Sequence, residues 1–168
     1  MKMRIGNGYD VHLLSPGLRL VLGGVEIPHT KGLVAHSDGD VAIHALCDAL
    51  MGSLSLGDIG HHFPDTSAEF KGIDSKILLQ RTYSLVLEKG YRMVNADITI
   101  LLQKPKVAPY ILQMRETIAK TLSGVNSEYP CGIEDISVKA TTTEGAGFVG
   151  REEGVAVYAT VLVEKICE

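Results

Sequence analysis

The alternation of apolar and polar positions predicts four strands, spread over separate parts of the chain. Side chains in a strand point alternately to its two faces, so alternation with period two indicates one buried face. The expected strands cover residues 3–14, 92–103, 133–141 and 155–165. A short hairpin over residues 18–22 and 25–27 is expected around Gly23 and Gly24, since paired glycines suit a tight turn.

Apolar positions three and four residues apart predict helices elsewhere. The expected helices cover residues 38–54, 74–89 and the stretch from Pro109 to about residue 122. Ser37 or Asp38 is suited to cap the first helix, and Gly90 to end the second. The order of elements lacks strict strand–helix alternation. We therefore expect an α+β fold, a two-layer sandwich with a mostly four-stranded mixed sheet, helices on one face and a small hairpin.

Composition restricts the classes of protein to which the chain can belong. The 168 residues carry a net charge of −4, and no segment concentrates Lys and Arg, so nucleic acid is not an expected partner. We expect one domain over residues 1–168, because no linker, repeat or low-complexity segment interrupts the sequence. No apolar run is long enough to span a bilayer, and the N-terminus lacks a signal-peptide pattern. The three cysteines include no CxxC pair, which argues against a disulfide framework. The expected location is the cytoplasm, or an organelle stroma after removal of a transit peptide.

The clearest candidate chemistry is a metal site. Asp10 and His12 lie two positions apart in a predicted strand and so share one face. His44 lies in an apolar helix with Asp40 and Asp48 one turn away on either side, and Asp48 is well placed to orient the imidazole. A carboxylate and two histidines leave one position of a tetrahedral metal open, as in catalytic zinc sites. Mn²⁺ and Fe²⁺ also accept these donors.

Polar groups suited to a phosphorylated ligand occur in three other segments. His36 and Ser37 precede the first helix, whose N-terminus favours an anion. The polar loop over residues 57–71 contains Asp58 and Asp65, which can accept hydrogen bonds from a polyol. A threonine run ends in Glu144 and a glycine-rich turn, where hydroxyls and amides can hold phosphate and the carboxylate can bind Mg²⁺ or Mn²⁺.

Several of these segments together resemble one enzyme family. The matching segments are Arg4–His12, Ala35–His44, Leu56–Gly60, Phe63–Thr66, Lys139–Glu144 and Gly147–Phe148. In this order and spacing the chain resembles the 2-C-methyl-D-erythritol 2,4-cyclodiphosphate synthases of the non-mevalonate isoprenoid pathway. The resemblance covers nearly the whole chain. It implies cyclisation of 4-diphosphocytidyl-2-C-methyl-D-erythritol 2-phosphate, with release of CMP, by a homotrimer whose active sites lie between subunits.

The same resemblance implies a role for individual residues. Asp10, His12 and His44 match zinc ligands, Glu144 matches the ligand of a Mg²⁺ or Mn²⁺ ion that binds with substrate, and His36 and Thr142 match the catalytic residues. The residues expected to bind substrate are Asp10, His12, His36, Ser37, Asp58, Ile59, Gly60, Phe63, Pro64, Asp65, Thr66, Ser67, Leu102, Gln103, Lys104, Pro105, Lys106, Val107, Ala108, Thr141, Thr142, Thr143, Glu144, Phe148 and Arg151. Positions matching an axial cavity of the trimer are Tyr9, Phe148, Arg151 and Glu153.

Two departures and two rival interpretations accompany the resemblance. Asn7 stands where many members carry His, and Leu102 is larger than the usual Ala, which affects the expected nucleobase pocket. A zinc-dependent phosphohydrolase could use the same open metal site to activate water. A non-enzymatic module could use zinc only to join strand to helix, but it would need a fourth protein ligand, and none is evident nearby.

Overall fold

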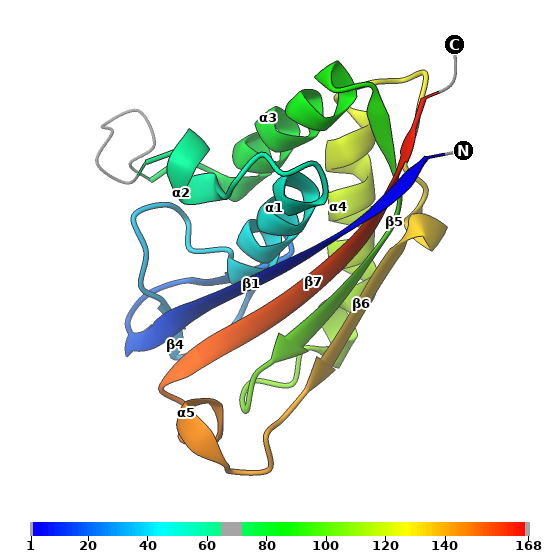
Figure 1. Cartoon of the computed structure of the whole chain (residues 1–168). Helices are drawn as coiled ribbons and strands as arrows, with labels where there is room; N and C mark the ends of the chain where they lie inside the picture. The colour runs from blue at the N-terminus through cyan, green and yellow to red at the C-terminus, as the bar shows by residue number, and fades with distance from the viewer. Residues whose placement is uncertain (1, 65–71, 167–168) are drawn as a thin grey trace.

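A five-stranded sheet with helices on one face forms the body of the protein (Figure 1). The computed structural model describes residues 2–64 and 72–166. The sheet has the order β4-β1-β7-β5-β6, in which β5 and β6 are parallel and the other neighbours antiparallel. Its strands are β1 (Met3–Pro16), β4 (Lys31–Leu33), β5 (Tyr91–Leu101), β6 (Ile136–Thr141) and β7 (Gly154–Lys165). The expected mixed sheet is confirmed.

The number of strands differs from the expected four. β4 adds a fifth strand, pairing Leu33 with Leu14 near the end of β1. Its three residues, Lys-Gly-Leu, are too few to show an alternating pattern, so this strand was not predicted. The expected hairpin is present as β2 (Leu20–Leu22) and β3 (Val25–Ile27), with both turn glycines at positive φ.

Three long helices lie on one side of the sheet (Figure 1). They are α1 (Val41–Ser53), α3 (Ser75–Glu88) and α4 (Ile111–Ser123). Shorter pieces are the helices α2 (Ile59–His62) and α5 (Gly147–Gly150) and the 3₁₀ turns η2 (Ala108–Tyr110) and η3 (Ile133–Asp135). No helix among residues 2–64 and 72–166 combines the length and apolar character needed to cross a bilayer.

The first helix begins later than expected, because its cap is Asp40 rather than Ser37 or Asp38. The Asp40 carboxylate is fully buried and accepts hydrogen bonds from the amides of Ala42 and Ile43 in the first turn. It also accepts from Gly23 and Gly24 in the β2–β3 turn. Burial raises the pKa of Asp40 to about 6, although these amides favour its ionised form. The cap thus holds the start of α1 against the hairpin.

Helix α1 packs unusually close to strand β1. A Cβ added at Gly8 would lie 2.0 Å from the carbonyl oxygen of Ala45, and one at Gly6 would lie 1.9 Å from that of Ala49. Both distances are far inside van der Waals contact, so only glycine permits this approach. It places the following residues of β1, Asp10 and His12, directly beside His44 of α1.

The opposite face of the sheet exposes large apolar side chains. Alternate residues of β1, on the side away from α1, are between 42% and 71% exposed: Met3, Ile5, Tyr9, Val11 and Leu13. Tyr158 of β7 lies beside them, with its ring centroid 4.7 Å from that of Tyr9. An apolar face of this kind is typical of a surface that another protein covers.

Candidate metal centre

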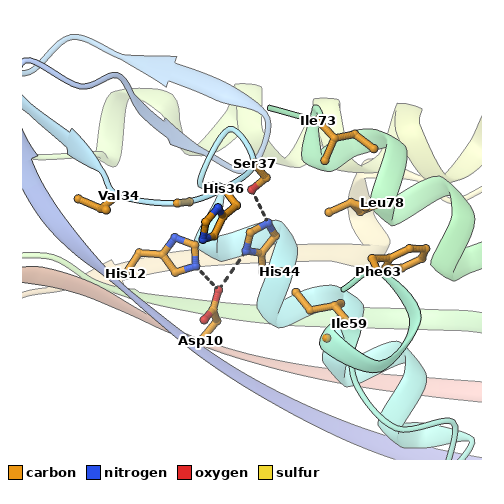
Figure 2. A pocket seen from close by; sticks show the side chains of 12 residues that line it. Asp10, His12, Val34, His36, Ser37, His44, Ile59, Phe63, Ile73 and Leu78 are labelled. Atoms are coloured by element: carbon orange, nitrogen blue, oxygen red, sulfur yellow. Dashed lines mark hydrogen bonds and ion pairs between the residues drawn. The ribbon is translucent and has the colours of Figure 1, made fainter. Parts of the chain in front are cut away.

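Three side chains from two elements converge at one point, as the sequence predicted. Asp10 Oδ2 lies 2.9 Å from Nε2 of His12 and 3.2 Å from Nδ1 of His44. One donor atom from each residue lies within 4.8 Å of the other two. Figure 2 shows both imidazoles directed at the Asp10 carboxylate.

The donor set fits a divalent metal ion. Two ligand atoms at about 2.0–2.1 Å from a tetrahedral zinc are roughly 3.4 Å apart, close to the two measured separations. Oxygen and imidazole donors without a thiolate suit zinc, manganese and iron alike. Among the described residues no fourth acidic, histidine or cysteine ligand joins this group. Three protein ligands are the number found in catalytic zinc sites.

Asp10 and His44 shift one another's pKa values in opposite directions. Burial of Asp10 would raise its pKa, but the hydrogen bonds from His12 and His44 outweigh burial and hold it well below its usual range. Burial of His44 would lower its pKa, but the hydrogen bond and negative charge of Asp10 outweigh this and raise it. A cation is therefore favoured at this position, whether it is a proton or a metal.

The three ligands form one wall of a cavity of about 290 Å³. His36 and Ser37 lie beside the ligands, and Ile59 and Phe63 lie on the other side of the His44 ring (Figure 2). Gly60 also lines the cavity. The amides of Ala42 and Ile43 in α1 already bind Asp40, so the expected anion site at this helix N-terminus is not available through them. Side chains in the cavity, His36 and Ser37, remain the candidates for contact with an anion.

Comparison with known proteins identifies the family. The chain matches the YgbB family over residues 3–164. It is 57% identical over 161 residues to 2-C-methyl-D-erythritol 2,4-cyclodiphosphate synthase of Azotobacter vinelandii, covering 96% of this chain and 98% of the relative. The enzyme of the same name from Alcanivorax borkumensis is 56% identical, with 98% of each chain covered.

The chain belongs to the YgbB family.

Solved structures agree with this assignment. The bifunctional IspDF from Campylobacter jejuni superposes with a TM-score of 0.91 and 43% identity, over 98% of this chain and 43% of that longer one. A 2C-methyl-D-erythritol-2,4-cyclodiphosphate synthase described as bound to CDP gives a TM-score of 0.85 at 34% identity, covering 96% of this chain and all of that one.

The hydrogen bond of Asp48 in this YgbB-family site goes to the backbone rather than to His44. Asp48 Oδ1 accepts a hydrogen bond from the amide of Ile59, 2.8 Å away, and thereby holds α2 against α1. The outer nitrogen of His44, Nε2, instead lies 2.9 Å from Oγ of Ser75 and 3.2 Å from Oγ of Ser37. Helical spacing placed Asp48 on the correct face, but the amide of Ile59 competes for its carboxylate. Ser75 was missed because it lies 31 residues beyond His44, and no local pattern connects the two.

The residues expected to hold the cytidine nucleotide form a different cavity. It has a volume of about 170 Å³, and its lining includes the expected residues Leu102, Gln103, Pro105, Lys106, Val107, Ala108, Thr141 and Thr142. Lys104 instead forms an ion pair with Glu152. Nearby, the Thr142 hydroxyl donates to Glu144 Oε1, 2.5 Å away, and the backbone of Glu144 has a positive φ of 52°. Glu144 does not belong to the Asp10 cluster.

The two cavities are separated across the sheet within one chain. One row of paired residues crosses the sheet from Val11 of β1, through Ala156 of β7 and Leu101 of β5, to Thr141 of β6. Three strand spacings of about 4.8 Å place the ends of this row roughly 14 Å apart. One chain therefore does not bring its metal centre and its candidate nucleotide pocket into contact.

The remaining expected site residues fall in three places. Asp58 caps α2 through the amide of His61, beside the metal cavity, and Pro64 follows Phe63 at its edge. Asp65, Thr66 and Ser67 lie outside the described residues. Tyr9 and Phe148 line a third cavity of about 190 Å³ together with Thr143, while Arg151 forms an ion pair with Glu153 on the surface.

Proposed function

We propose that this chain is a 2-C-methyl-D-erythritol 2,4-cyclodiphosphate synthase. It converts 4-diphosphocytidyl-2-C-methyl-D-erythritol 2-phosphate to the 2,4-cyclodiphosphate and releases CMP. The observation that carries the proposal is the Asp10, His12 and His44 cluster with an open position facing a cavity. The names of the relatives describe the same activity, and they give no support to the zinc-dependent phosphohydrolase.

The proposed reaction is intramolecular, so the chain mainly has to fold and hold the substrate. The 2-phosphate attacks the β-phosphorus, the bond between the β-phosphorus and the bridging oxygen breaks, and CMP leaves with that oxygen. Asp10, His12 and His44 would hold one zinc ion per subunit, which would neutralise phosphate charge. His36 and Ser37 lie where they can donate hydrogen bonds to phosphate oxygens in the same cavity.

The nucleotide half of the site supplies the second set of contacts. The Leu102–Ala108 segment and Thr141 would bind the cytidine moiety and its phosphates. The Thr142 hydroxyl would donate to the reacting diphosphate, and Glu144 would hold Mg²⁺ or Mn²⁺ with the substrate. Ile59, Gly60, Phe63 and Asp58 would enclose the methylerythritol group beside the zinc.

We further propose a homotrimer in which neighbouring subunits complete each site. Two observations support it: the separation of about 14 Å between the two half-sites of one chain, and the exposed apolar face of β1 that an assembly would cover. In this arrangement Tyr9, Phe148, Arg151 and Glu153 surround the threefold axis. Each chain is one domain, in keeping with its single extended hydrophobic core.

The activity is tested by incubating the purified chain with the cytidylated substrate, Zn²⁺ and Mg²⁺. Cyclisation yields CMP and a cyclic diphosphate by ³¹P NMR. Release of inorganic phosphate instead would identify a phosphohydrolase and refute the proposal.

The shared site is tested by mixing two inactive variants. His44→Ala removes the metal half and Thr142→Ala removes the nucleotide half. If sites form between subunits, refolding the two together at equal amounts restores one site in each mixed trimer, which is about a quarter of all sites in the mixture. Absence of any recovery, with mixed trimers verified by mass spectrometry, would place both halves within one chain.

A further inference from the structure

A chain of hydrogen bonds reaches the metal cluster from behind His44. His44 is 6% exposed, and Ser75, the first residue of α3, is fully buried. Ser75 Oγ lies 2.9 Å from His44 Nε2 and also donates a hydrogen bond to Oδ1 of Asp38. This series of hydrogen bonds therefore runs from the Asp38 carboxylate through the Ser75 hydroxyl to the His44 imidazole.

The donor and acceptor roles along this chain follow from chemistry. A carboxylate only accepts, so the single hydroxyl hydrogen of Ser75 is committed to Asp38. The lone pairs of Ser75 Oγ then face His44, so a hydrogen bond between the two residues needs a hydrogen on Nε2 of His44. The neutral imidazole consequently carries its hydrogen on Nε2 and directs the lone pair of Nδ1 at Asp10.

Asp10 by itself favours the opposite tautomer. Its Oδ2 lies 3.2 Å from Nδ1 of His44 and would accept a hydrogen from that nitrogen. With the hydrogen on Nδ1, the lone pair of Nε2 would meet the lone pairs of Ser75 Oγ at 2.9 Å, which is repulsive. The second neighbour of Nε2, Ser37 Oγ, accepts from the amide of Gly39 and lies farther away at 3.2 Å, where its hydroxyl can accept from or donate to Nε2 and so does not decide the tautomer.

Further hydrogen bonds hold the Asp38 carboxylate in the position from which it accepts the Ser75 hydroxyl hydrogen. Its Oδ2 accepts from the amide of Ser75 at 3.0 Å, and its Oδ1 also accepts from the amide of Asp40 at 3.2 Å. These two amides belong to the start of α3 and to the residue that caps α1. The carboxylate therefore ties together the two helices that flank the imidazole.

We propose that Ser75 and Asp38 are positioning residues that fix His44 as an Nδ1 metal ligand. They hold the hydrogen on Nε2, orient the ring toward Asp10 and His12, and increase its basicity through the carboxylate. Neither residue lines the cavity beside the metal ligands. The inference rests on the proposed metal-dependent function, and it concerns metal binding rather than turnover.

The test compares Ser75→Ala with Asp74→Ala. Alanine at position 75 keeps the backbone amide that donates to Asp38 and removes only the hydroxyl. Asp74 is the neighbouring cap of α3, where it accepts from the amide of Lys76. Its loss weakens the same helix end but leaves the hydrogen-bond chain in place, which makes it the matched structural control.

Two readouts separate positioning from folding. Zinc affinity, measured by competition with a chromophoric chelator, should fall about 10–100-fold in Ser75→Ala and less than about threefold in Asp74→Ala. Two-bond ¹H–¹⁵N spectra of the zinc-free proteins, at a pH above the titration of His44, should show Nε2–H in wild type and a shift toward Nδ1–H in Ser75→Ala.

Wild-type zinc affinity in Ser75→Ala would overturn the proposal, and so would an Nδ1–H tautomer of His44 in the wild-type protein. An equal loss of affinity in both variants would also overturn it, because the effect would then come from the helix end. None of these measurements uses turnover, so CMP release still tests the proposed activity independently.

Discussion

Replacing Gly8 by alanine should damage the metal centre through the backbone, without touching a ligand. The new Cβ would lie 2.0 Å from the carbonyl oxygen of Ala45 and 2.7 Å from the amide nitrogen of Ala49. Ordinary contact begins at 3.4 Å, so strand and helix must separate by about 1.4 Å. Because the obstacle is helix backbone rather than a flexible side chain, the free energy of unfolding should fall by about 3 kcal/mol.

The same displacement predicts a loss of zinc binding. Ala45 is adjacent to His44, and Gly8 precedes Asp10 by two residues on the same face of β1. Moving the helix by about 1.4 Å would widen the 3.2 Å separation of His44 Nδ1 from Asp10 Oδ2 to roughly 4.6 Å. Two ligands of one tetrahedral zinc cannot lie that far apart, so we expect an affinity loss of at least about 100-fold.

The assay combines urea unfolding of the zinc-free protein with chelator competition. Gly52→Ala is the control, since a Cβ there would meet only the carbonyl oxygen of Asn7, at an ordinary 3.7 Å. Gly52 lies within α1, so alanine should stabilise the helix by about 0.5–1 kcal/mol and leave zinc binding intact. If Gly8→Ala unfolds within about 0.5 kcal/mol of wild type and binds zinc normally, the close contact of strand and helix does not position the ligands.

Three further predictions concern metal binding and assembly. Zinc competes with a proton for His44, whose pKa burial would lower but the hydrogen bond and negative charge of Asp10 raise. Zinc affinity should therefore fall by about tenfold per pH unit once the solution is acidic enough to protonate His44, as chelator competition at a series of pH values would show. An affinity that stays constant down to about pH 5 would contradict this. Glu144→Gln should leave zinc content unchanged, because Glu144 is outside the Asp10 cluster, but should abolish stimulation by Mg²⁺ or Mn²⁺; an unchanged metal requirement would argue against its role. Ile5→Lys places a charge on the exposed apolar face, where Ile5 is 71% exposed, and should shift the sedimentation coefficient toward that of a monomer with little change in the unfolding of the subunit; an unaltered trimer would show that this face is not the interface.

The sequence predicted the parts of the structure that depend on local pattern. Alternation located β1, β5 and β7, and period 3.6 located the three long helices, each within a few residues. The metal ligands were predictable because Asp10 and His12 share a strand face, and because His44 is a polar residue in an apolar helix. Strand β4 has three residues and gave no periodic signal.

Features that depend on contacts between distant segments were not predictable. Asp40 became the helix cap because the hairpin glycines bring two more amides to its carboxylate, and these glycines lie 16 and 17 residues away. Asp48 was assigned to His44 on helical spacing, whereas the amide that binds it belongs to the next element. Ser75 reaches His44 only because α3 packs against α1. In each case tertiary packing brings in a partner that is distant in the sequence, and a local sequence pattern does not reveal such a partner.

Strand β1 connects the fold with the proposed site through its two faces. On the face toward α1 the strand carries Gly6 and Gly8, against which the helix backbone packs, and then Asp10 and His12. The same face of the strand therefore contacts the helix and carries two of the three metal ligands. On the other face it carries apolar residues that remain exposed in the single chain. A shift of one residue in the register with β7 would exchange these faces, turning the ligands outward and the apolar residues toward α1. The glycines forbid this exchange, because side chains such as Ile5 or Tyr9 could not enter the space where the backbone of α1 lies against Gly6 and Gly8. The close contact of strand and helix therefore sets both the position of the metal ligands and the face left open for assembly.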